Sequence, residues 1–65
     1  MDTKNIILKL RTERGMSQDE LADKIMVTRQ AVSRWEHGIS VPDAELLIQL
    51  AEVLDVNVSD LLGKK

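Results

Sequence analysis

Apolar residues recur along this chain at spacings of three and four, which is the period of an amphipathic helix. Near the start, Ile6, Ile7 and Leu10 form one stripe, and Gly15 stands where that helix would end. No segment alternates with period two over a useful length. The pattern predicts an all-α chain with five helices, at about residues 3–14, 18–25, 29–36, 44–54 and 58–62.

Capping residues stand in front of four of the predicted helices. The letters SQDE at residues 17–20 form a capping box, in which the serine accepts from a free backbone N–H and the glutamate reaches back. Thr28 and Asp43 are N-cap residues for the third and fourth helices, and NVSD at residues 57–60 is a second capping box. Because caps satisfy backbone groups that a helix end leaves unpaired, they indicate where each helix begins.

The inward faces of these helices supply one small core. A chain of 65 residues buries little apolar area and is only marginally stable, yet 43% of it is apolar, which is typical of a folded domain. We therefore expect one domain spanning residues 1–65, with residues 63–65 frayed. The expected inward residues are Ile6, Ile7, Leu10, Leu21, Ala22, Ile25, Val32, Trp35, Leu47, Leu50, Ala51, Leu54, Leu61 and Leu62.

Composition narrows the setting in which the chain works. It has no cysteine, so it forms no disulfide and fits a reducing cytosol. No apolar run approaches the roughly 20 residues of a membrane span, and the first ten residues lack the basic region and cleavage site of a signal peptide. We predict a cytoplasmic protein with no membrane partner.

The charge is divided unevenly along the chain. The net charge is −2, but residues 1–37 carry seven Lys/Arg against six Asp/Glu, whereas residues 38–65 carry two against five. Non-specific affinity for DNA comes from neutralising phosphates. If the chain binds DNA, we therefore expect weak non-specific binding and selectivity from a few well-placed contacts.

The candidate chemistry for an enzyme is poor. His37 is the only histidine, and one histidine without cysteine cannot assemble a zinc site. It is equally suited to touch a phosphate or to end a helix in solvent. Asp19, Glu20 and Asp23 are better explained as a solvated helix face than as catalytic carboxylates, and Ser40 near His37 has no supporting third residue. We predict no catalytic residue, no metal and no cofactor.

Residues 17–36 carry the functional signal. They are predicted to form two short helices around a tight turn, the layout of a helix-turn-helix whose second helix lies in the DNA major groove. Arg29 and Gln30 lie on the outer side of that second helix, with Ser33 and Arg34. Arginine can make two hydrogen bonds to guanine and glutamine two to adenine, so this surface suits base recognition.

Four stretches together resemble a known family. The letters LKLRTERGMSQDELADKI, VTRQAVSRWEHG, PDAELLIQLAEVLDV and SDLL follow one another in order and cover nearly all 65 residues. In this the chain resembles the phage-repressor and Cro-like (XRE-type) helix-turn-helix domains of bacteria and phages. The resemblance implies a five-helix, lambda-repressor-like fold. It also implies sequence-specific binding of double-stranded DNA by a transcriptional regulator, a repressor on our interpretation, with residues 28–36 reading the major groove.

The resemblance also implies roles for individual residues. Gln18 matches a position that holds a phosphate or orients a side chain of the recognition helix. Arg11 and Glu36 match a structural ion pair between the first and third helices, beside the DNA backbone. The residues implied to contact DNA are Arg11, Gln18, Thr28, Arg29, Gln30, Ser33 and Arg34.

The chain departs from the family pattern in three places. Met26 replaces a common glycine in the turn, where positive φ is often needed, so Met26 is either strained or an exposed apolar contact. Asp55 replaces another glycine after the fourth helix, and aspartate tolerates the left-handed region better. Residues 39–41 carry no charge where relatives often have Lys or Arg. We therefore expect fewer phosphate contacts and modest affinity for one subunit.

The interpretation leaves some alternatives open. We expect a weak homodimer that pairs on a pseudo-palindromic operator, with Val56, Val58 and Leu62 as a small apolar patch. The chain is either a complete small regulator or a cut domain. The negative net charge and the uncharged loop also allow a protein-interaction module, such as an antitoxin or adaptor, with the same fold. A mobility-shift experiment separates the two functions.

Overall fold

The computed structural model describes residues 3–61, and it contains five helices and no strand within that range. Residues 62–65, which include the predicted end of the last helix and the predicted frayed tail, lie outside the described residues. The all-α prediction is confirmed, although the first two helices each end one residue earlier than predicted. The helices are α1 (Thr3–Glu13), α2 (Gln18–Lys24), α3 (Arg29–Glu36), α4 (Ala44–Leu54) and α5 (Val58–Leu61).

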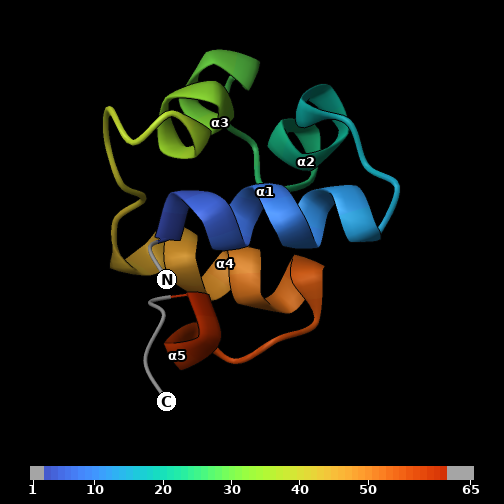
Figure 1. Ribbon diagram of the computed structural model, residues 1–65, viewed down its shortest axis with the longest axis vertical. Coiled ribbons are helices and arrows are strands. Elements are labelled where there is room, and N and C mark those ends of the chain that lie inside the picture. The colour runs from blue at the N-terminus through green and yellow to red at the C-terminus, as the bar shows by residue number, and fades with distance from the viewer. Residues whose placement is uncertain (1–2, 62–65) are drawn as a thin grey trace.

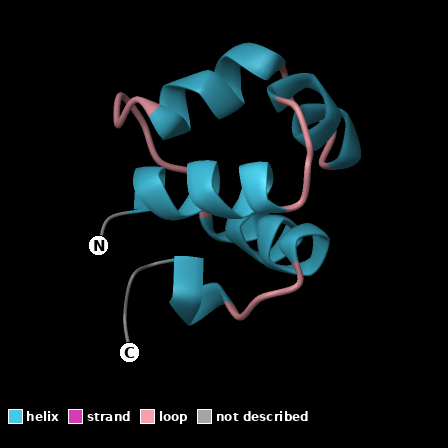
Figure 2. Ribbon diagram, turned by 45° about the vertical axis from the view of Figure 1, so that its right-hand side comes forward, coloured by secondary structure: helices cyan, strands magenta, loops and turns pink. Residues whose placement is uncertain are grey.

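Helix α1 lies across the middle of the fold and separates two pairs of helices. Figure 1 shows α2 and α3 on one side of α1 and α4 and α5 on the other, and Figure 2 shows the same layers after rotation. Contacts of α1 with both α3 and α5 join the layers into one core. The buried core residues are Ile7, Leu21, Ala22, Ile25, Val32, Trp35, Leu50, Ala51, Leu54 and Leu61.

The predicted caps are present. The Ser17 hydroxyl accepts from the backbone N–H of Glu20 at 3.0 Å, and the Glu20 carboxylate accepts from the backbone N–H of Ser17 at 2.9 Å. Asp43 caps α4 by accepting from the backbone N–H of Leu46 at 2.9 Å. Before α5, the Asp60 carboxylate accepts from the backbone N–H of residue 57 at 3.3 Å, which is one of the two bonds of the predicted box.

Within residues 3–61, two residues other than glycine adopt the left-handed region. Met26 has φ of 59° and is 91% exposed, so it is both strained and an exposed apolar side chain. Asp55 has φ of 58° and ends α4, where its backbone N–H donates to carbonyls in the last turn. Such a conformation costs on the order of 1 kcal/mol for a residue other than glycine. Both turns therefore hold a small local strain that the packed helices around them offset.

Candidate nucleic-acid interface

The turn between α2 and α3 is closed by backbone hydrogen bonds. The N–H of Met26 donates to the carbonyl of Asp23 at 3.3 Å, and the N–H of Val27 donates to the carbonyl of Ala22 at 3.0 Å. Thr28 then caps α3, because its hydroxyl accepts from the backbone N–H of Ala31 at 3.2 Å. The predicted helix-turn-helix is therefore present, and Thr28 precedes the first helical residue rather than belonging to the helix.

One side of α3 is fixed in the core. Val32 is 0% and Trp35 is 4% exposed, and both pack among the buried residues of the other helices. Trp35 is thus a core residue, as its spacing from Val32 predicts, and its ring is not available for stacking on bases. Because two anchors three residues apart define one face, they fix how α3 is rotated about its axis.

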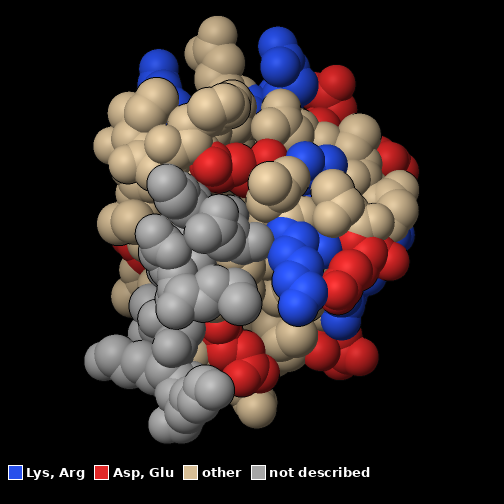
Figure 3. Space-filling model, in the orientation of Figure 1, with Lys and Arg blue, Asp and Glu red and all other residues tan. Residues whose placement is uncertain are grey.

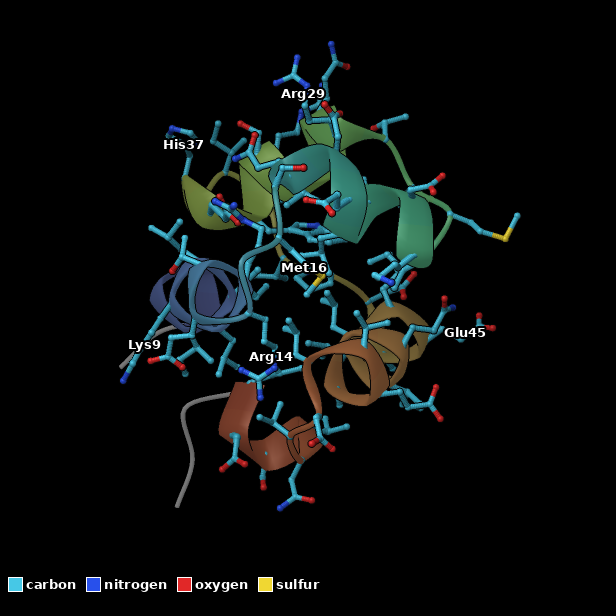
Figure 4. All side chains as sticks on the ribbon, turned by 90° about the vertical axis from the view of Figure 1, so that its right-hand side faces the viewer. Lys9, Arg14, Met16, Arg29, His37 and Glu45 are labelled. Atoms are coloured by element: carbon cyan, nitrogen blue, oxygen red, sulfur yellow. The ribbon has the colours of Figure 1, made fainter. Side chains whose placement is uncertain are left out.

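The opposite side of α3 carries the predicted recognition residues. Arg29 and Ser33 are four residues apart, and so are Gln30 and Arg34, so each pair is stacked along the helix. Thr28, Arg29, Gln30 and Arg34 are exposed, whereas Ser33 is half-buried. In Figure 4, Arg29 points outward at the end of the molecule that lies opposite α5. The structure therefore brings these five residues to one surface.

Arg11 and Gln18 belong to a network centred on Glu36. The Glu36 carboxylate accepts from Arg11 Nε at 2.7 Å and Nη2 at 3.1 Å, and from Gln18 Nε2 at 2.8 Å. Arg11 Nη1 donates to the carbonyl of Met16 at 2.8 Å. The side chains of Arg11 and Glu36 are only 12% and 4% exposed. One carboxylate on α3 thereby joins α1 and α2.

This network constrains what Gln18 can present. A carboxylate only accepts hydrogen bonds, so the amide nitrogen of Gln18 must face Glu36 and its carbonyl oxygen must face away. One amide hydrogen remains for another acceptor. The resemblance pairs Arg11 with Glu36, and it gives Gln18 either a phosphate contact or the orienting of a recognition-helix side chain. The bond of Gln18 to Glu36 of α3 is of the second kind. The sequence gives no signal for the bond of Arg11 to the Met16 carbonyl.

A second ion pair lies on the exposed side of the helix-turn-helix. Arg29 Nε is 3.6 Å from Asp19 Oδ1, and the side chains are 58% and 78% exposed. Sequence reasoning places Asp19 on a solvated face, which agrees with its exposure but misses its partner. Figure 3 shows Lys and Arg interspersed with Asp and Glu over the visible face, without one continuous basic patch. That visible face thus offers phosphates a few separate positive charges and no broad positive region.

The end of α3 is occupied by His37. Its Nδ1 lies 2.7 Å from the carbonyl oxygen of Ser33 and 3.4 Å from the Ser33 hydroxyl. Because the carbonyl only accepts, Nδ1 carries the proton in this contact. Ile39 and Val41 in the loop that follows are 74% and 75% exposed. His37 thus places a polar side chain at the end of α3, just before a loop that exposes the apolar side chains of Ile39 and Val41.

Within the part of the chain that the structure describes, no group of three His, Cys, Asp or Glu side chains is placed to hold a metal ion. No helix of that part has the length and apolar character that crossing a membrane requires. The exposed polar side chains of α2 and α3 remain the candidate functional site of these residues.

Comparisons with known proteins agree with this geometry. The model of a family described as helix-turn-helix matches residues 7–61. The chain is 32% identical over 63 residues to the HTH-type transcriptional activator BcrR of Enterococcus faecalis. That match covers 97% of this chain but 31% of BcrR, so the chain spans about a third of that relative.

Two solved structures with bound DNA share the fold. The P22 c2 repressor in complex with a synthetic operator superimposes with a TM-score of 0.94 at 25% identity, covering 100% of this chain and 98% of that one. The biofilm master regulator SinR in complex with DNA gives a TM-score of 0.84 at 33% identity, covering 91% of this chain and 95% of that one. The five-helix arrangement is therefore that of lambda-repressor-like proteins.

Proposed function

The chain belongs to this helix-turn-helix family, and on that premise we propose that it binds double-stranded DNA sequence-specifically as the DNA-binding domain of a transcriptional regulator. The observation that carries the proposal is the outer side of α3, where Arg29, Gln30 and Arg34 are exposed while two core anchors fix the helix. The P22 c2 repressor, which was solved on its operator, supports the same docking.

In the proposed complex, α3 lies in the major groove. Arg29 donates two hydrogen bonds to a guanine, and Gln30 pairs with an adenine edge, each contributing about 1–3 kcal/mol of discrimination. Ser33 and Arg34, one turn further along, reach neighbouring bases or phosphates, and Thr28 lies at the backbone beside them. The proposed contact residues are Arg11, Gln18, Thr28, Arg29, Gln30, Ser33 and Arg34.

Arg11 and Gln18 contribute to phosphate binding through the Glu36 network. Gln18 has one amide hydrogen left after its bond to Glu36, and it donates this hydrogen to a phosphate. The guanidinium of Arg11 has five N–H donors, of which three are directed to Glu36 and Met16. Because Arg11 is held so firmly, its phosphate contact needs no ordering of a flexible side chain.

The regulator acts as a cytoplasmic, non-enzymatic repressor in which residues 1–65 form a single domain. Two copies occupy half-sites about 34 Å apart on a pseudo-palindromic operator and exclude the polymerase. Val56 and Val58 pack partly against the core of their own chain, which leaves little apolar surface for a partner and supports weak pairing. Leu62, the third residue of the predicted patch, lies outside the described residues.

Selection from a random duplex pool tests this function. We expect a two-fold palindrome to be enriched, and Arg29→Ala to weaken binding to it by roughly five- to 150-fold. Arg14→Ala is the matched control, because Arg14 is also exposed but follows the end of α1 and lies away from Arg29 (Figure 4). Equal losses in the two variants would show that α3 is not the docking surface.

The same selection experiment separates DNA binding from the alternative function, a protein-interaction module. A protein-interaction module would enrich no sequence and shift no duplex at low salt, while remaining folded by circular dichroism. A reporter gene downstream of the selected operator then gives the direction of regulation. Lower expression with the protein present supports repression, and higher expression means that the domain belongs to an activator.

A further inference from the structure

Asp19 and Arg29 link the first turns of the two helices of the helix-turn-helix. Asp19 is the second residue of α2, and Arg29 is the first residue of α3. Arg29 Nε lies 3.6 Å from Asp19 Oδ1, which is within ion-pair distance. The pair therefore joins a carboxylate from one helix to the first proposed base-reading side chain of the other.

The position of Arg29 explains why a carboxylate from another helix is needed there. A helix N-terminus carries partial positive charge, which disfavours a cation. The first turn of α3 contains no acidic residue. Asp19 supplies the compensating negative charge from α2, where an acidic side chain in the first turn is favourable. The charge of Arg29 is thus offset by a carboxylate of α2 and not by one of its own helix.

Asp19 lies nearest to the stem side of the Arg29 guanidinium. The nitrogen closest to it is Nε, and at 3.6 Å the contact is an ion pair without a hydrogen bond. Within the described residues, the terminal nitrogens of Arg29 make no hydrogen bond. These two nitrogens form the edge that can donate in parallel to guanine O6 and N7. Since Arg29 is 58% exposed, its terminal nitrogens are accessible to a base.

We infer that Asp19 is a positioning residue that aims Arg29 at a guanine and raises selectivity at that base pair. The inference rests on the proposed function. Asp19 is 78% exposed and adds a negative charge on the DNA side, which opposes binding to phosphates of any sequence. Asp19 therefore lowers general affinity while it raises the preference that Arg29 expresses.

The test compares Asp19→Asn with Asp23→Asn on the selected operator and on duplexes changed at single base pairs. Asp23 lies on the same helix, lines the same shallow hollow as Asp19 and Arg29, and is exposed. Both variants remove one negative charge, so both should tighten binding to all duplexes. Asp19→Asn alone should reduce the preference for guanine at one position by about two- to fivefold, the range of an exposed ion pair.

A double-mutant cycle identifies the partner. Arg29→Ala should abolish the preference at the same base pair, and the double variant should show no further loss of that preference. The inference is overturned if Asp19→Asn leaves every base preference unchanged. It is also overturned if Asp19→Asn changes the preference at a base pair that Arg29→Ala does not affect. In both cases the proposed function stands. A folded wild-type protein that shows no sequence preference overturns both.

Discussion

Two arginine–carboxylate pairs in this protein have similar chemistry and opposite surroundings. Arg11 Nε lies 2.7 Å from Glu36 Oε2, and the two side chains are 12% and 4% exposed. Arg29 Nε lies 3.6 Å from Asp19 Oδ1, and both of these side chains are mostly exposed. The first pair has further hydrogen bonds to both partners. The second has only the one ion contact within the described residues.

The difference separates two roles. The buried network of Arg11, Gln18 and Glu36, which we call the frame, supports the fold, whereas the exposed pair of Asp19 and Arg29 belongs to the proposed DNA-binding surface. A desolvated charge that loses its partner is left uncompensated, so the Arg11–Glu36 pair must stay intact in every state of the fold. An exposed pair contributes little to stability because water and salt replace either partner. Arg29 can therefore engage DNA without destabilising the protein, while Arg11 and Glu36 hold the three helices that present it.

The largest effect is expected from breaking the buried pair. Glu36→Ala leaves Arg11 without its carboxylate and removes the acceptor of Gln18, so the free energy of unfolding should fall by about 3 kcal/mol. Urea denaturation measures this change. Glu52→Ala, which removes an exposed glutamate from α4, is the control and should change stability by less than about 0.5 kcal/mol. Similar values for both variants would show that the network is dispensable.

A smaller effect is expected at Gln18. Gln18→Ala removes one hydrogen bond to the Glu36 carboxylate but leaves the ion pair with Arg11, so stability should fall by about 1–2 kcal/mol. Gln30→Ala is the matched control, because the Gln30 side chain is exposed and its truncation leaves no buried acceptor without a donor. If Gln18→Ala unfolds no more easily than Gln30→Ala, the bond to Glu36 does not contribute to the frame.

The smallest effect is expected at the exposed pair. A double-mutant cycle of Asp19→Ala and Arg29→Ala should give a coupling free energy of unfolding of about 0.5 kcal/mol or less at low salt. In 1 M NaCl, where the Debye length is about 3 Å, that coupling should vanish. The coupling between Arg11 and Glu36 should persist under the same conditions. A salt-resistant coupling at Asp19 and Arg29 would place that pair in the frame as well.

Features of the fold that depend on neighbouring residues could be predicted from the sequence. Ser17, Thr28 and Asp43 cap helices through backbone groups three residues away, so the starts of α2, α3 and α4 were predicted correctly. Met26 was predicted to be strained or exposed and is both, because the local turn alone sets its φ.

Contacts between helices could be predicted less well. Arg11 and Glu36 are 25 residues apart, and only a family resemblance pairs them. The resemblance lets Gln18 orient a side chain of the recognition helix without saying which one. Nothing in the sequence indicates that Asp19 faces Arg29, because such contacts require the crossing of α2 over α3. The roles of the exposed residues of α3 on DNA stay predictions, since they depend on a partner molecule.

The length of α3 limits how much sequence one copy can read. Its eight residues extend about 12 Å, which covers roughly four base pairs. Four base pairs specify about eight bits, whereas naming one site among the 10⁶–10⁹ competitors in a genome takes roughly 20–30 bits. When α3 reads DNA, most of the sequence information that specifies one site must therefore come from contacts outside this one helix.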